Sequence, residues 1–296
     1  MISIVICSVN TGNLSEVNKS ISTTIGIEYE LLIWDNQREN KGLCEVYNMM
    51  AEKARFDYVC FLHEDIIFET NNWGIRLVDI FSKQPTTGVI GVAGSKYKSI
   101  AFSGWYTGIK EFDCANITHR FSYGDELIYL RPVDNNEQEE VVCLDGVFIC
   151  ARKKIWDTIR FDQEKLPGFH FYDIDFSTRA AAICAIVVTY EIGLIHITKG
   201  GDFGDNWVKV AISYHLAMKK QLPFTRVAVN TQEIEQIIIR SWLDLLKNYR
   251  ISIINKWGWI SRQKLLLRPS LFYSILKFLL YKPLGLRHIH KPGSKK

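Results

Sequence analysis

The C-terminal part of the chain has no acidic residue. No Asp or Glu follows Asp244 in the 296-residue sequence, whereas twelve Lys and Arg residues do. Because the net charge of the whole chain is only +4, residues 1–244 carry a net charge of −8. This asymmetry predicts an acidic body and a basic tail that seeks a surface.

Other absences exclude whole classes of protein. The seven cysteines include no CxxC pair and lie mostly in apolar runs, which predicts the reduced core thiols of a cytoplasmic protein rather than a disulfide framework. No basic segment follows Met1 and no small-residue cleavage site follows the first apolar run, so we expect no signal peptide. No run of 18 apolar residues occurs, which argues against a membrane-spanning helix. No repeat or low-complexity tract is visible.

Apolar runs alternate with segments of helical periodicity. This pattern predicts right-handed βαβ units and a parallel sheet flanked by helices. In the first hundred residues we expect strands over 2–9, 29–36, 58–65 and 88–94, and helices over 14–21, 42–54 and 71–82. Residues 94–124 are rich in Ser, Gly and aromatics and predict a long irregular loop. Further along we expect strands over 125–133, 139–151, 186–192 and 193–197, and helices from about 153, within 169–185, over 205–220, over 231–248 and in short pieces from 251.

Polar side chains follow three of the predicted strands where each strand ends. Ser8 and Asn10 follow the first, Asp35 and Asn36 the second, and the triplet His63-Glu64-Asp65 the third. Ligands of open α/β sheets bind beyond the carboxyl ends of the strands. Carboxylates there suit Mg²⁺ or Mn²⁺ shared with substrate phosphates. The alternative is that the triplet merely ends a strand in solvent or caps the next helix.

The order and spacing of several stretches resemble a known family. These stretches are ISIVICSVN, WDN, NKGLCEVYNMMAEKA, YVCFLHEDI, GVIGVAGS, LDGVFICARK and FHFYDIDFSTRA, and they cover roughly the first two thirds of the chain. Together they resemble the GT-A glycosyltransferases of the large inverting family two, and within it the streptomycin-biosynthesis (StrF-like) group. The resemblance implies a Rossmann-like, mostly parallel α/β fold. We expect a catalytic domain over 1–225, with a nucleotide-sugar half over 1–95 and an acceptor half over 120–225, and a helical basic region over 226–296.

The resemblance also implies site residues on the donor side. Residues that match the nucleotide-sugar pocket of the family are Ser8, Asn10, Asp35, Asn36, Gly42, Asn48, His63 and Glu64. The triplet replaces the family's DxD motif, with His63 in place of the first aspartate and Asp65 as the chief ligand of Mn²⁺ or Mg²⁺. His196 is placed to complete the metal site, although a lone histidine in an apolar strand is more often a core residue.

Acidic residues further along match the family's catalytic segments. Asp173 in YDIDF corresponds to the base that takes the proton from the acceptor hydroxyl, and Asp175 could orient the acceptor. Both could instead cap the following helix. Asp145 and Gly146 match the floor of the acceptor site, although an Asp-Gly pair is also a common hairpin turn.

The resemblance implies transfer of a sugar, of hexosyl type, from a nucleotide-sugar donor to a saccharide or lipid-linked saccharide acceptor in bacterial cell-surface polysaccharide or lipopolysaccharide synthesis. The basic aromatic tail favours contact with the anionic inner face of the membrane, against a solvated helical cap or nucleic acid, for which no motif is visible. Two other classes stay open. A nucleotidyltransferase is disfavoured because the loop NTGNLSE has no basic residue, and a non-catalytic sugar-binding or nucleotide-binding module would fit a decayed metal motif.

Overall fold

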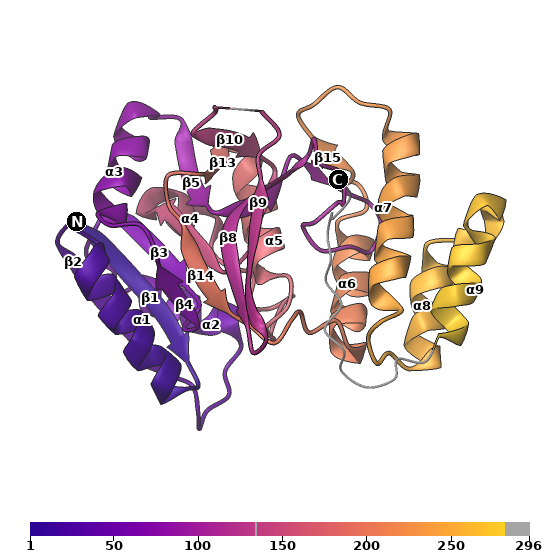
Figure 1. Ribbon diagram of the computed structural model, residues 1–296, viewed down its shortest axis with the longest axis horizontal. Coiled ribbons are helices and arrows are strands. Elements are labelled where there is room, and N and C mark those ends of the chain that lie inside the picture. Colours follow the sequence, from indigo (N-terminus) through magenta and orange to yellow (C-terminus); the bar gives the residue numbers. More distant parts are fainter. Residues whose placement is uncertain (134, 282–296) are drawn as a thin grey trace. The chain divides into compact units, whose positions relative to one another are not determined.

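The computed structural model describes residues 1–133 and 135–281 and divides the chain into two compact units (Figure 1). The first unit comprises Met1–Lys96 and Lys110–Thr198, and the second comprises Tyr97–Ile109 and the chain from Lys199 onward. Residues 282–296 of the predicted basic region lie outside the described residues. Within the described part of the chain, no helix combines the length and apolar character needed to cross a membrane.

The first unit is built on a mostly parallel seven-stranded sheet, as predicted. Its strand order is β10-β13-β5-β12-β3-β1-β2, and β1 pairs in parallel with both β2 and β3. Strand β12 runs antiparallel between β3 and β5, and β10 is antiparallel to β13 at the edge. The strands are β1 (Ile2–Ser8), β2 (Tyr29–Asp35), β3 (Tyr58–Leu62), β5 (Thr87–Gly91), β10 (Gln138–Val141), β12 (Phe148–Arg152) and β13 (Ala185–Thr189).

A second sheet in the same unit was not predicted. Its order is β11-β6-β8-β14-β4, with β9 paired to β8. The prediction of a long irregular loop over 94–124 was wrong in part, because this sheet takes two strands from that segment. The strands are β4 (Ile66–Phe68), β6 (Ala93–Ser95), β8 (Asp113–Phe121), β9 (Gly124–Leu130), β11 (Cys143–Leu144) and β14 (Leu194–Ile197).

The predicted strand over 139–151 is three strands. Strand β11 pairs with β6 of the second sheet, whereas β12 pairs with β3 and β5 of the main sheet. The chain therefore passes from one sheet to the other at Asp145–Val147. The sequence gives no sign of this change of sheet, because most side chains before and after Asp145–Val147 are apolar and buried.

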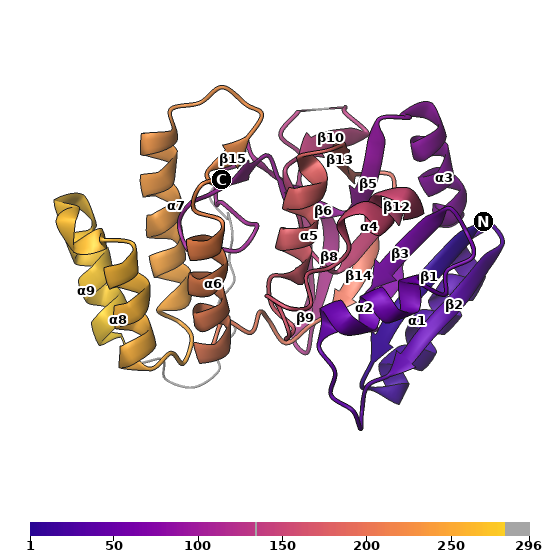
Figure 2. The ribbon, with the colours of Figure 1, turned by 180° about the vertical axis from the view of Figure 1, so that it is seen from behind.

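Five helices flank the sheets of the first unit. Helix α1 packs against β4, α2 against β1 and β2, and α5 against β11 and β13. Figure 2 shows α2, α4 and α5 on the face of the main sheet that is turned toward the viewer. The helices are α1 (Thr11–Thr24), α2 (Leu43–Ala51), α3 (Trp73–Lys83), α4 (Lys153–Ile159) and α5 (Tyr172–Ala181).

The second unit is helical. Helix α8 packs on α6, α9 packs on α7, and α8 and α9 contact each other. Residues 97–109 join this unit through a short two-stranded pairing of β7 with β15. The elements are β7 (Tyr97–Lys98), α6 (Asp205–Ala217), β15 (Phe224–Thr225), α7 (Thr231–Leu246), α8 (Ile253–Arg262), α9 (Phe272–Leu280) and the 3-10 turns η1 (Leu265–Leu267) and η2 (Pro269–Leu271).

Candidate functional site

The predicted polar groups meet at the carboxyl edge of the main sheet. Ser8 lies opposite Asp35 in the β1–β2 ladder, and Leu62, which precedes the triplet, lies opposite Ile6 of β1. Because these strands are parallel neighbours, their carboxyl ends share one edge. The structure thus brings the three strand ends together in the first unit.

Glu64 ties two of these ends together. Its carboxylate accepts hydrogen bonds from the Ser8 hydroxyl (2.6 Å) and from the backbone amides of Val9 (3.2 Å) and Asn10 (3.1 Å). The Asn10 side chain in turn caps α1 by accepting from the amides of Gly12 and Asn13. Glu64 and Asn10 therefore shape the turn after β1, since charge-assisted hydrogen bonds hold its backbone amides in place.

His63, Asp65 and His196 form a cluster that could hold a metal ion. One ligand atom from each residue lies within 4.8 Å of the others. The Asp65 Oδ1 atom is 3.5 Å from His196 Nε2 and 3.8 Å from His63 Nδ1. Strand pairing explains how His196 arrives there: β14 runs antiparallel to β4 with His196 opposite Ile66, the residue after Asp65.

The chemistry of this cluster fits a divalent cation. Asp65 Oδ1 is buried and has no hydrogen-bond partner among the described residues. A buried acceptor in that state is costly unless a ligand completes it. Burial alone would raise the pKa of Asp65, but the neighbouring His196 and His63 outweigh it and hold that pKa below its ordinary value. Asp65 is therefore a carboxylate at neutral pH, which is the form that binds a metal.

The two histidines respond differently to this site. Burial lowers the pKa of His63 although Asp65 opposes the shift, so its imidazole is neutral near pH 7. Burial would also lower the pKa of His196, but Asp65 outweighs burial and raises it. A neutral imidazole keeps the lone pair that a metal ligand needs.

A second cluster consists of two aspartates and joins the chain at Asp145–Val147 to the start of α5. Asp145 accepts from the amide of Val147 (2.9 Å), and Asp173 accepts from the amide of Gly146 (2.9 Å). Burial, helped by the charge of Asp145, raises the pKa of Asp173 to about 7. A Cβ atom at Gly146 would collide with the Tyr172 hydroxyl, so glycine is required for this close approach.

Tyr172 links the two clusters. Its hydroxyl donates to the carbonyl oxygen of Gly146 (3.1 Å) and lies 2.8 Å from His63 Nε2. Because the hydroxyl has one proton, it accepts from His63 Nε2–H in this arrangement, which leaves His63 Nδ1 unprotonated and turned toward Asp65. A partner that fixes the second ring nitrogen is a usual feature of metal-binding histidines. The residue before it, Phe171, has a left-handed backbone (φ 68°, ψ 2°), which is strained for an aromatic residue and is typical of functional loops.

Other predicted residues lie at or near this edge with partners of their own. Asp35 is exposed and accepts from the amide of Gln37 (3.0 Å), and Asn36 is buried and bonded to the backbone of Lys41. Gly42 starts α2, where a Cβ atom would collide with the Pro167 carbonyl oxygen. These three residues hold the chain between β2 and α2.

Two predicted residues are held inside the fold. The Asn48 amide bonds both the amide and the carbonyl oxygen of Phe161 (3.0 and 2.8 Å). The Asp175 carboxylate is buried and pairs with the guanidinium of Arg179 at 2.8 and 2.6 Å. The structure therefore keeps Asp175 apart from the contacts that join Asp173 to Gly146.

Two functional candidates were missed by sequence reasoning. Tyr172 stands inside the YDIDF stretch, but a single tyrosine beside an apolar residue is usually a core residue. His119 in β8 lies opposite His196 in the parallel ladder, with ring centroids 5.5 Å apart. Only the register of β8 and β14 shows that His119 borders the metal-type cluster, and no local motif reports that register.

Comparisons with known proteins place this chain in a family. Residues 3–210, more than two thirds of the chain, match the model of a glycosyltransferase-like family. A search of curated proteins finds no match. Among solved structures, S. aureus TarS has a TM-score of 0.54 at 12% identity, covering 93% of this chain and 53% of that chain.

Two further structures are similar. TarS residues 1–349 in complex with UDP-GlcNAc has a TM-score of 0.51 at 13% identity, covering 94% of this chain and 88% of that chain. GalNAc-T7 with UDP, GalNAc and Mn²⁺ has a TM-score of 0.50 at 13% identity, covering 96% of this chain and 58% of that chain. The present chain thus spans little more than half of TarS and of GalNAc-T7. The similarities show a shared GT-A fold, and the family match over most of the length shows that the chain belongs to the glycosyltransferase-like family.

Proposed function

We propose that this chain transfers a sugar from a nucleotide-diphosphate sugar to an acceptor hydroxyl, with inversion and with the help of a divalent metal. The single observation that carries the proposal is the connection through Tyr172. Its hydroxyl contacts His63 of the metal-type cluster on one side and Gly146, which binds Asp173, on the other. A site for the donor diphosphate and a candidate base thus belong to one connected array.

The donor class is supported by the fold and by the cluster. TarS 1–349 was crystallised with UDP-GlcNAc, and GalNAc-T7 with UDP, GalNAc and Mn²⁺. In the present chain we propose that Ser8, Asn10, Asp35 and Asn36 border the nucleotide. Asp35 is the exposed carboxylate of this group, and it is therefore the candidate to bind ribose or base. Glu64, Gly42 and Asn48 would act by holding the surrounding turns.

The proposed metal ligands are Asp65, His63 and His196. Mn²⁺ suits this donor set better than Mg²⁺ does, since Mg²⁺ prefers oxygen ligands and two of the three ligands here are imidazoles. A bound ion would supply positive charge that stabilises the leaving diphosphate. Tyr172 would keep the Nδ1 lone pair of His63 available by accepting from Nε2–H.

Asp173 is the proposed general base. As the acceptor oxygen attacks the anomeric carbon, its hydroxyl proton passes to the Asp173 carboxylate. The bond from that carbon to the diphosphate oxygen breaks, and its electron pair leaves with the nucleoside diphosphate. A pKa of about 7 suits this task because a base works best when its pKa is near the working pH. Asp145 and Gly146 would line the acceptor side, and Asp145 would also help to set that pKa.

Finer features of the function rest on the sequence resemblance. We propose membership of the StrF-like group, hexosyl transfer, and an acceptor that is a saccharide or lipid-linked saccharide of cell-surface polysaccharide synthesis. The reaction would take place in the cytoplasm. The boundary between the proposed nucleotide-sugar half and the proposed acceptor half would lie within the first unit.

The test is calorimetric titration of UDP, GDP, dTDP and CDP, each with and without Mn²⁺. The proteins are the wild type, Asp65→Ala and Asp157→Ala, the last a carboxylate exposed on α4 as the matched control. We expect one nucleotide to bind in a Mn²⁺-dependent way to wild type and control, and to lose that binding in Asp65→Ala. Absence of nucleotide binding under every condition would refute the donor site, and binding without any turnover would favour a non-catalytic module.

A further inference from the structure

Exposed apolar side chains gather at the C-terminal end of the second unit. Among the described residues, 22 large apolar side chains are exposed, and ten of them lie within residues 253–281, about a tenth of the chain. We call this set the outer face. Its members are Ile253, Ile254 and Trp257 of α8, Leu266 and Leu267 of η1, and Phe272, Tyr273, Leu276, Leu280 and Tyr281 on and after α9.

The exposed residues occupy one side of each helix. In α8 the residues at 253, 254 and 257 share a side, whereas Lys256, Trp259 and Ile260 on the adjoining side are buried. In α9 the residues at 272, 273, 276 and 280 share a side, and the opposite side buries Ile275 and Phe278. Because α8 packs on α6 and α9 packs on α7, the apolar sides are those left uncovered by the helices beneath.

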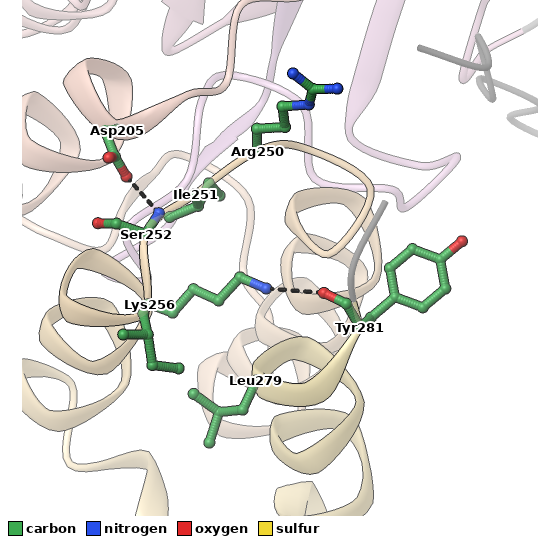
Figure 3. Close-up of a pocket in the computed structure, with 8 residues that line it drawn as sticks. Asp205, Arg250, Ile251, Ser252, Lys256, Leu279 and Tyr281 are labelled. Atoms are coloured by element: carbon green, nitrogen blue, oxygen red, sulfur yellow. Dashed lines mark hydrogen bonds between the residues drawn. The ribbon is translucent and has the colours of Figure 1, made fainter. Parts of the chain in front are cut away.

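Specific contacts hold the two helices together as a platform. The buried ammonium of Lys256 donates to the carbonyl oxygens of Phe278 (2.7 Å) and Tyr281 (3.1 Å), at the C-terminal end of α9. Figure 3 shows the hydrogen bond to Tyr281. A cation is favourable there because the helix dipole and the last carbonyl groups are negative. The start of α8 is fixed as well, because the amide of Ser252 donates to Asp205 of α6 (2.7 Å). Lys256 is thus used inside the unit, and Trp257 one residue later is presented to solvent.

The charged side chains within residues 253–281 are all positive. Arg262 and Lys264 at the end of α8 and Lys277 of α9 are exposed, and Arg268 between the 3-10 turns is partly exposed. No acidic residue occurs in the chain after Asp244. A partner for this face must therefore accept apolar side chains and offer negative charge.

That requirement selects among the possible occupants. A second copy bound through the same face would bring like charges together with no acidic residue to pair them, which is unfavourable. Nucleic acid offers phosphates but no surface into which Leu267 and Phe272 could bury. An anionic phospholipid surface offers both an apolar layer and negative headgroups, and helices with one apolar side and flanking Lys and Arg lie in that interface.

We propose that the outer face binds the surface of an anionic phospholipid membrane, with α8, η1 and α9 lying in the headgroup layer. Leu267 and Phe272, which are 78% and 67% exposed, are two of its apolar anchors. Arg262, Lys264, Arg268 and Lys277 contact the headgroups. The proposal does not depend on the transfer reaction proposed above.

Vesicle sedimentation of the full purified chain tests the proposal. The vesicles are phosphatidylcholine alone or phosphatidylcholine with about 30% phosphatidylglycerol, a fraction that gives an anionic surface. We expect binding to the anionic vesicles that weakens as salt is raised. The double variant Leu267→Ser/Phe272→Ser should lower the partition coefficient by about a hundredfold or more, because burial of each anchor is worth about tenfold or more. Arg262→Gln/Lys264→Gln should lower it less and reduce the salt dependence.

Matched controls separate docking from folding. Leu127→Ser removes a side chain that is 63% exposed in the first unit, and it should sediment like wild type. All variants should keep the wild-type melting temperature and the wild-type affinity for the donor nucleotide, so a failure of the transferase proposal would be seen separately. Equal partition into neutral vesicles, unchanged partition of the anchor variant, or a dimer that only the anchor variant disrupts would each overturn the proposal.

Discussion

Each unit contains a cluster of polar and charged side chains that includes a histidine. The two clusters differ in how many of their buried polar atoms form hydrogen bonds. In the second unit, Glu235 accepts from the hydroxyls of Tyr97 (2.9 Å) and Ser99 (2.6 Å) and from two backbone amides. Lys98 donates to His215 Nε2 (2.8 Å) and to backbone carbonyls nearby. In the first unit, Asp65 keeps a buried oxygen with no hydrogen bond among the described residues.

The difference separates a buried charge whose contacts serve folding from one that is left available for the proposed metal ion. Glu235, Lys98 and His215 attach residues 97–109 to α6 and α7, and their contacts account for the charge. His215 donates from Nδ1 to the Ala211 carbonyl oxygen (2.7 Å), and burial with the adjacent Lys98 lowers its pKa well below the ordinary value. Asp65, His63 and His196 instead point ligand atoms at one another. The two clusters are therefore distinguished by how many of their buried polar atoms form hydrogen bonds, and not by the types of residue present.

The largest contrast is expected from two isosteric neutralisations, Asp173→Asn and Glu235→Gln. Asp173→Asn should lower kcat by about 10²- to 10⁴-fold, the usual contribution of a general base, with donor affinity unchanged. Glu235→Gln should leave kcat and Mn²⁺ affinity nearly intact but lower the free energy of unfolding by about 2 kcal/mol, because an amide cannot accept all four hydrogen bonds. Initial rates and thermal unfolding measure both, and the comparison fails if the two variants behave alike.

Asp173→Asn should also raise the melting temperature at pH 8. The folded-state pKa of about 7 lies above the ordinary aspartate value of 3.8 because burial disfavours the charged form. The stability that the protonated carboxyl contributes is present below pH 4 and is lost as pH rises to about 7. The gain in the variant should therefore be a few degrees at pH 8 and vanish near pH 4, as calorimetry at the two pH values would reveal.

The next effect concerns the metal. Asp65→Asn should weaken Mn²⁺ binding about 100-fold or more, since it removes the only carboxylate of the cluster, and His196→Ala should weaken it somewhat less. Asp65→Asn should also lower the free energy of unfolding, because His196 and His63 stabilise the ionised carboxylate in the folded state. Mn²⁺ titration monitored by electron paramagnetic resonance gives the affinities, and Glu235→Gln is the control. An unchanged affinity in Asp65→Asn would remove the cluster from the proposal.

A smaller effect is expected from pH. If Asp173 with a pKa of about 7 is the base, kcat should rise about tenfold between pH 6 and pH 8 and level off above, because only the ionised form accepts the proton. Asp145→Asn should shift the midpoint to lower pH, since the charge of Asp145 helps to raise the pKa of Asp173. An unshifted midpoint in this variant would assign the titration to another group, whatever its effect on the acceptor KM.

Local patterns were enough to predict much of the first unit. The polar strand ends after β1, β2 and β3 were predicted to share an edge, and the parallel pairing of β1 with β2 and β3 places them there. The same patterns placed Asp173 at the start of α5. These features depend on neighbouring residues in the chain, which a sequence displays directly.

Features that depend on distant pairing could not be predicted. The second sheet unites β4, β8 and β14 from three separate parts of the chain, and the residues of β8 show mixed burial without a clean period of two. The role of Tyr172 required the positions of His63 and Gly146 together. The assignment of residues 97–109 to the second unit rests on Glu235 and His215, more than a hundred residues away.

The smallest predicted effect distinguishes two acids that stand two residues apart in the sequence. Asp175→Asn should change kcat by no more than about threefold and lower the free energy of unfolding by about 1–2 kcal/mol, because it weakens a buried, charge-assisted pair. That pair joins Asp175 to Arg179, which also donates to the carbonyl oxygen of Arg160 (2.7 Å) and so ties α5 to the end of α4. Steady-state rates and urea unfolding of Asp175→Asn, with Asp173→Asn alongside, provide the measurement. A fall in kcat like that of Asp173→Asn, or a specific rise in the acceptor KM, would instead support the acceptor-orienting role predicted from the sequence and would extend the reactive array of the first unit beyond the residues that Tyr172 connects.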